Sequence, residues 1–118
     1  ALYVYRALDS ERMNRLAGEL CGQHDFSAFC SQKSDVGDKT RTVTSAAVRR
    51  EGVEVLFTVS ADGFLYNMVR IMAGTLLDLE YRKAPPGAVQ KILESKNRKS
   101  AGKTAPAHGL YLTEVSYN

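Results

Sequence analysis

The chain has 118 residues, a formal net charge of +3 and a pI near 9.0, with 44% hydrophobic and 25% charged residues. These proportions are typical of one folded domain and exclude a disordered, collagen-like or coiled-coil chain. The charge is compatible with an anionic partner but is too small to establish one. Charged residues interrupt every apolar stretch before it reaches membrane-spanning length, so we expect a cytoplasmic protein without a membrane partner.

The first part of the chain predicts a helix and then a loop. Asp9 is a good N-cap residue, and apolar residues recur at helical spacing until Gly22 ends the pattern. These apolar residues are Met13, Leu16, Ala17 and Leu20. Residues 31–40 are polar and have no periodicity, which indicates a loop.

The middle of the chain predicts a β-hairpin and the longest helix. Residues 42–49 are rich in β-branched side chains, a turn follows at 51–52, and residues 53–59 alternate as a return strand. Residues 64–79 carry a wide apolar stripe at a spacing of three and four, which predicts a helix. The polar ridge on its other side consists of Asn67, Arg70, Gly74 and Asp78.

The last part predicts a short helix from Pro85-Pro86 to about Lys96, a basic loop, and a final strand at residues 110–117. This order of elements favours an α+β fold in which helices pack on one face of an antiparallel sheet. We expect residues 1–118 to form a single domain. Because the chain starts with Ala1 and enters a strand-like alternation at once, we also expect it to be part of a longer protein.

Arg70 is the first candidate functional residue. Helical spacing places it beside Asn67 and Gly74, and the missing side chain at Gly74 allows another backbone or a substrate to approach closely. An arginine on the solvated side of a helix accounts for the same pattern, and periodicity alone does not decide between these interpretations.

Two clusters of basic residues could bind phosphate groups. They are Lys39, Arg41, Arg49 and Arg50, and Lys96, Arg98, Lys99 and Lys103. Solvated surface charge accounts for such clusters equally well. Nearby, Phe26 and Phe29 could stack on bases, or could fix their loop to the core.

Residues that bind metals or act as nucleophiles are few. Two histidines and two cysteines lie at spacings that do not match a zinc site, so we expect no metal and expect Cys21 and Cys30 to be free thiols. His24 and Asp25 are adjacent in sequence, and adjacent side chains rarely face each other. An acid–base pair is therefore not indicated.

Four sequence blocks stand out: they are residues 22–29 (GQHDFSAF), 39–42 (KTRT), 63–70 (GFLYNMVR) and 101–112 (AGKTAPAHGLYL). In this order they resemble the C-terminal half of the tRNA pseudouridine synthase A (TruA-like) family, and the third block is the most diagnostic. The resemblance covers nearly the whole chain.

The resemblance implies an enzyme that converts uridine to pseudouridine in the tRNA anticodon stem-loop, as a homodimer and with no cofactor. Family members attack the target nucleotide with an Asp in an Arg-Thr-Asp motif of their N-terminal half. In this chain Arg41-Thr42 is followed by Val43. We therefore expect the chain to lack the N-terminal half of its own protein and to be inactive alone.

The resemblance also implies roles for individual residues. Arg70 matches the family's arginine that pairs with the nucleophilic Asp, and a bidentate guanidinium contact keeps such a carboxylate ionised. Leu110 resembles the apolar residue that lines the base pocket, while Arg41, with Lys39 in the same block, is the candidate for contacting RNA backbone. The other candidate substrate-binding residues are Tyr66 and Asn67.

Two alternatives remain open at this point. The chain could be an RNA-binding module that uses Lys39, Arg41 and residues 96–103 without doing chemistry, or a dimerisation domain whose apolar surface is only structural.

Overall fold

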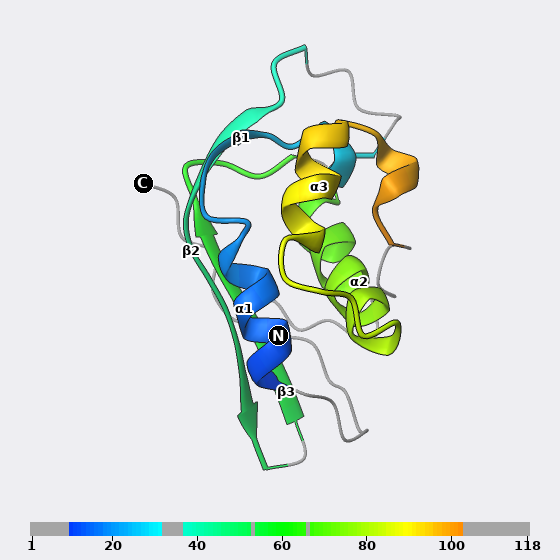
Figure 1. The fold of residues 1–118 in the computed structure, drawn as a ribbon. Helices are drawn as coiled ribbons and strands as arrows, with labels where there is room; N and C mark the ends of the chain where they lie inside the picture. Colours follow the sequence, from blue (N-terminus) through cyan, green and yellow to red (C-terminus); the bar gives the residue numbers. More distant parts are fainter. Residues whose placement is uncertain (1–9, 32–36, 53, 66, 103–118) are drawn as a thin grey trace.

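The computed structural model describes residues 10–31, 37–52, 54–65 and 67–102. They form the helices α1 (Ser10–Gly18), α2 (Met68–Tyr81) and α3 (Ala88–Ser95), the strands β1 (Gly22–Asp25), β2 (Thr40–Glu51) and β3 (Glu54–Ala61), and the 3₁₀ helices η1 (Ser27–Phe29) and η2 (Arg98–Ser100) (Figure 1). The predicted strand at 110–117 lies outside the described residues, as does Val53 of the predicted return strand.

The strands form an antiparallel sheet in the order β1-β2-β3. The predicted hairpin is confirmed, with Glu51 paired to Glu54 and Gly52 in the turn at a φ of +61°, a conformation that favours glycine. Strand β1 was not predicted, because its sequence GQHD is polar and does not alternate. It is a strand because it pairs with the first residues of β2, from Thr40 to Val43.

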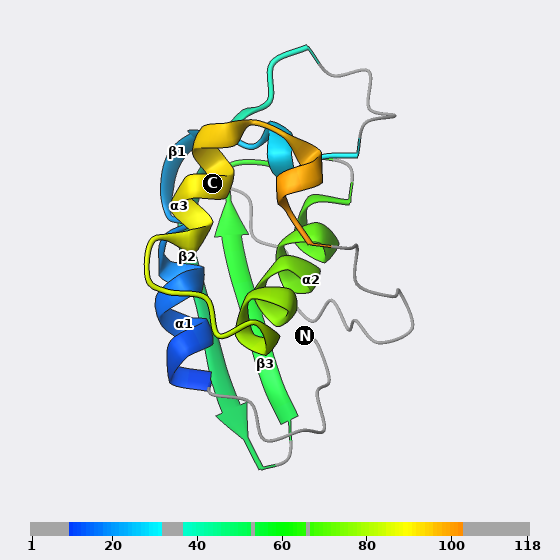
Figure 2. The same cartoon turned by 45° about the vertical axis from the view of Figure 1, so that its right-hand side comes forward.

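The expected α+β fold is confirmed: α1 packs along β2 and also contacts α2 and α3 (Figures 1 and 2). The predicted apolar face of α1, together with the following turn, is buried, with Leu16 and Leu20 each 1% exposed. Burial of a leucine of this kind contributes about 1.5–3 kcal/mol. On the outer side of the hairpin, the paired residues Ala47 and Thr58 are exposed, so the core lies on the helical side of the sheet.

The predicted long helix starts four residues later than its apolar pattern indicated. Asn67 precedes α2 with a φ of +60°, in the left-handed region that interrupts a right-handed helix. Phe64 and Leu65 fit the helical spacing, but they pack on the core from an irregular segment before this break. The prediction was wrong here because periodicity reports which residues are buried and does not report the backbone conformation at Asn67.

The short helix α3 also starts later than predicted, since Pro85 and Pro86 lie before it and Gly87, with a φ of +91°, is its N-cap. Glu19, just after α1, accepts hydrogen bonds from the backbone N–H groups of Gly87 at 2.9 Å and Gln90 at 3.0 Å. One carboxylate thereby satisfies two backbone donors at the start of α3 and holds α1 to α3.

A second connection between helices is a partly buried ion pair. Nη1 of Arg12 in α1 lies 3.1 Å from Oε1 of Glu80 in α2, and the Glu80 side chain is only 8% exposed. Among the described residues, no helix is both long enough and apolar enough to cross a membrane.

Replacing Glu19 with Ala should lower the free energy of unfolding by about 1 kcal/mol, since two backbone donors at the start of α3 lose their acceptor. Amide hydrogen exchange in α3 should accelerate. The control is Glu94→Ala, which removes an exposed carboxylate from the same helix. Equal exchange of the α3 amides in the two variants would contradict this role of Glu19.

Candidate functional site

The first turn of α2 places Arg70 beside the residue that starts the helix. Its guanidinium Nη1 donates a hydrogen bond to Asn67 Oδ1 at 3.3 Å, and both residues are partly buried. The first turn contains no acidic residue. The N-terminus of a helix carries a partial positive charge, so the helix end and the guanidinium both favour a negatively charged group at this position.

The backbone at Gly102 packs against α2 beside the predicted polar ridge. The Gly102 N–H donates to Thr75 Oγ1 at 2.9 Å, and a Cβ atom at Gly102 would lie only 2.9 Å from Thr75 Cα and 3.0 Å from the Gly74 carbonyl oxygen. The sequence analysis allowed either a backbone segment or a substrate to approach Gly74 closely. In the structure it is the backbone of Gly102 that does so. This contact holds η2 beside the first half of α2, as both ribbon views show (Figures 1 and 2).

The residues expected to contact RNA backbone differ in their surroundings. Arg41 lies over Gly63, and its Nη1 donates to the carbonyl oxygens of Thr40 at 2.7 Å and Asp38 at 3.0 Å. It therefore stabilises the start of β2 against the segment that leads to α2. The backbone carbonyl of Lys39 accepts a hydrogen bond from Phe26 N at 2.9 Å, while its side chain lines a surface pocket.

This pocket joins parts of the two basic clusters. It has a volume of about 380 Å³ and is lined by residues of three chain segments, all of them polar or charged except Cys30. The lining residues that carry nitrogen or hydroxyl groups are Ser27, Ser31, Lys39, Lys96, Asn97 and Arg98. Arg98 also donates from Nη1 to the carbonyl oxygen of Gly102 at 2.9 Å, so the contact on α2 and the pocket share one side chain.

The carboxylate of Asp25 lies beside this pocket, because Ser27, to which it is hydrogen-bonded, lines the pocket. Asp25 accepts hydrogen bonds from the hydroxyl and the backbone N–H of Ser27. The hydrogen bond from the Ser27 hydroxyl holds the pKa of Asp25 below its usual value, although burial raises it. The positive charges of Lys96 and Lys39 also lower this pKa. Asp25 is therefore ionised at neutral pH and offsets part of the positive charge of the two lysines.

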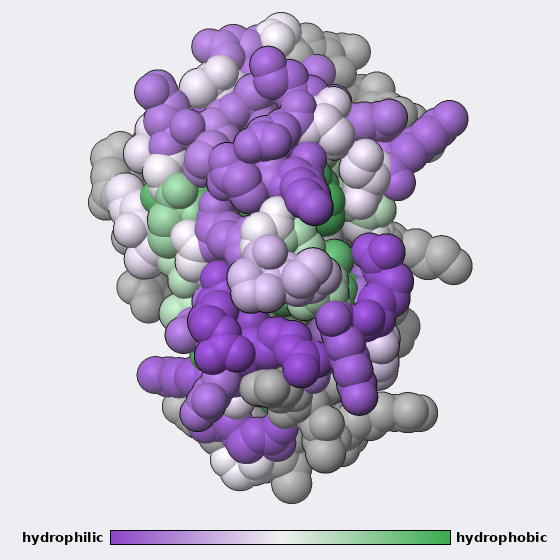
Figure 3. All heavy atoms as spheres, viewed as in Figure 1, coloured by the Kyte–Doolittle hydropathy of each residue, from purple (hydrophilic) through white to green (hydrophobic). Residues whose placement is uncertain are grey.

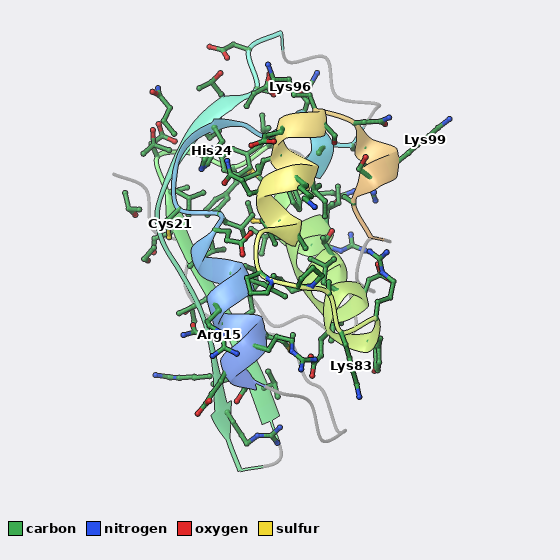
Figure 4. All side chains as sticks on the ribbon, in the orientation of Figure 1. Arg15, Cys21, His24, Lys83, Lys96 and Lys99 are labelled. Carbon is green, nitrogen blue, oxygen red and sulfur yellow. The ribbon has the colours of Figure 1, made fainter. Side chains whose placement is uncertain are left out.

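Other predicted residues lie away from the pocket. Arg49 and Arg50 are near the end of β2 that joins the hairpin turn, opposite the end where Lys39 lies. Lys99 projects outward from η2 (Figure 4). Three predicted residues lie outside the described residues: Lys103 of the second basic cluster, the base-pocket residue Leu110 and the substrate-binding residue Tyr66.

The remaining sequence interpretations are settled by burial and hydrogen bonds. Phe26 and Phe29 are 0% and 1% exposed with their rings 6.3 Å apart, so they fix η1 to the core. Cys21 and Cys30 are free thiols, as expected. His24 Nε2 lies 2.9 Å from the Cys21 carbonyl oxygen, whereas Asp25 bonds to Ser27, so the two adjacent side chains do not pair.

The family model described as tRNA pseudouridine synthase matches residues 16–118. The chain belongs to the tRNA pseudouridine synthase family. The match includes Arg70 on α2, the Lys39-Arg41 segment and the residues that line the pocket.

Relatives in this family are similar over nearly the whole chain. The tRNA pseudouridine synthase A of Halalkalibacterium halodurans is 51% identical over 108 residues, which cover 92% of this chain and 41% of the relative. That of Bacillus licheniformis is 47% identical over 118 residues, 100% of this chain and 48% of the relative. The chain thus spans less than half the length of these relatives.

Replacing Gly102 with Ala should displace the segment that docks on α2, because the atoms it would meet at 2.9 and 3.0 Å belong to backbone. We expect a loss of about 1–3 kcal/mol in unfolding free energy. Gly18→Ala is the control, since nothing lies within 4 Å of a Cβ there. If chemical denaturation gave equal stabilities for the two variants, the close approach on α2 would not be the constraint described.

Proposed function

We propose that this chain is the C-terminal part of a tRNA pseudouridine synthase that isomerises uridine to pseudouridine in the anticodon stem-loop, without a metal or organic cofactor. In this reaction the N1–C1′ bond of the nucleotide breaks and a C5–C1′ bond forms. The rest of the same protein supplies the nucleophilic Asp, and this chain supplies Arg70 and a basic surface for RNA.

The position of Arg70 carries the proposal. It closes the sequence block 63–70, and it lies on the first turn of α2 where the helix end adds positive potential. A carboxylate that meets this guanidinium stays ionised and oriented, because a planar fork can hold both oxygens. An aspartate in that state is suited to attack the target nucleotide.

RNA recognition on this chain is assigned to the segments around Arg70. Asn67 holds the Arg70 side chain, while Lys39 and Arg41 lie where β2 begins. Tyr66 and Leu110 complete the substrate-binding set by the family resemblance. Because the substrate is tRNA, the location is the cytoplasm, and the resemblance supports a homodimer as the active assembly.

The direct test is a tritium-release assay with the full-length protein and tRNA labelled at C5 of uridine, since the isomerisation replaces that hydrogen. We expect release from anticodon stem-loop uridines without added metal or cofactor. Binding of tRNA with no release would contradict the enzyme and favour an RNA-binding module. A monomeric full-length protein in analytical ultracentrifugation would contradict the homodimer.

Replacing Arg70 with Lys in the full-length protein should lower kcat on the order of 100-fold, because a lysine cannot reproduce the planar fork that orients the carboxylate. The affinity for tRNA should stay nearly the same, since the positive charge is kept. Arg15→Lys, on the exposed side of α1, is the matched control (Figure 4). Equal kcat values in both variants would remove Arg70 from the active site.

A further inference from the structure

We propose that the pocket between η1, Lys39 and the start of η2 binds a single phosphodiester group of the RNA backbone. This site rests on the proposed function, because it takes the RNA strand to be the ligand. It is separate from the pairing assigned to Arg70.

Three cationic side chains from two distant parts of the sequence line this pocket: Lys39 from one, and Lys96 and Arg98 from the other. Asp25 is the nearby carboxylate that acts on both lysines, and it is already engaged by two hydrogen bonds from Ser27. None of the residues that line the pocket is acidic, so its lining carries a positive charge that attracts an anion. A phosphodiester brings one negative charge and two free acceptor oxygens, which ammonium and guanidinium groups can bind.

Backbone contacts fix the places from which these cations extend. Lys96 ends α3 in the left-handed conformation, with a φ of +52° and its N–H bonded to the Leu93 carbonyl oxygen. Asn97 caps η2 by accepting a hydrogen bond from Lys99 N at 3.0 Å. Arg98 is held by its bond to Gly102. Little conformational entropy of the backbone is therefore lost when an anion binds.

The lining favours the RNA backbone over a base or a nucleotide. The two phenylalanines nearest to η1 are 0% and 1% exposed, so they offer no face on which a base could stack. Hydrophilic residues cover this upper part of the surface (Figure 3). Such a site recognises charge and is independent of base sequence.

The location suits a strand that also reaches Arg70. Gly102 connects η2 to α2 at Gly74 and Thr75, one helical turn beyond Arg70 on the same side of the helix. A nucleic-acid strand with its target base near the start of α2 can therefore place another phosphate over the pocket. The pocket would set the register of the strand and would not take part in the chemistry.

The test uses the full-length protein with Lys39→Gln and Lys96→Asn combined. Asparagine tolerates the left-handed conformation of Lys96, so the backbone can be kept. The matched control combines Lys83→Asn and Lys91→Gln, since Lys83 has the same φ of +52° and both lysines are exposed. Lys83 lies at the far end of α2 from Lys96 (Figure 4).

Affinity for tRNA is measured by fluorescence anisotropy over a range of salt concentrations. The pocket variant should bind about tenfold more weakly and should lose about 1 from the magnitude of the slope of log K against log salt, as expected for one phosphate contact. The control should keep the wild-type slope. Equal slopes in the pocket variant and the control, with unchanged thermal unfolding, would overturn the proposal.

Two further ligands separate this inference from the proposed function. Binding of single-stranded oligouridine to the pocket variant should show the same loss in the slope of log K against log salt. If that loss were seen while the full-length protein formed no pseudouridine, the phosphate pocket would be supported and the proposed enzyme activity contradicted. Inorganic phosphate should bind only weakly. If calorimetry showed phosphate binding as tightly as RNA and only in proteins with both lysines, the site would belong to a free anion and the RNA assignment would fail.

Discussion

The close contact between Gly102 and α2 is the constraint on which the arrangement of the site depends. The backbone at Gly102 approaches the helix at Gly74 and Thr75 more closely than any side chain at residue 102 would allow. Thr75 is 1% exposed, and its hydroxyl serves both as donor to the Ile71 carbonyl oxygen and as acceptor from Gly102 N. A contact of this kind has little freedom to slide, because it joins two backbones through a buried hydrogen bond.

The burial of α2 determines which side of the helix is open to this contact. Ile71, Met72 and Leu76 are each at most 1% exposed, so rotation of the helix would move these apolar side chains toward water. Arg70 and Gly74 are consequently held on the opposite side. The hydrophobic core thus fixes the direction of the one arginine that the proposed chemistry needs, although no core residue takes part in that chemistry.

The electrostatic arrangement follows from the same packing. Arg98 donates to Gly102 and also lines the basic pocket, so the segment docked on α2 brings its charge toward Lys39. Asp25 is ionised between Lys39 and Lys96 and limits their mutual repulsion. Positive charges that are far apart in the chain can therefore share one pocket without destabilising the fold.

The sequence by itself determined the fold class, the hairpin, the buried faces of the helices and the family, since hydrophobic periodicity and the block containing Arg70 are local properties of the chain. It did not determine strand β1, whose polar residues are held by pairing with β2, or the start of α2, where Asn67 adopts a left-handed conformation that spacing does not reveal. The sequence identified both basic clusters but did not indicate that residues from both line one pocket. Only the tertiary structure separates Arg49 from Lys39 and brings Lys39 beside Lys96, because contacts between distant residues arise from packing of the helices on the sheet and not from any local pattern.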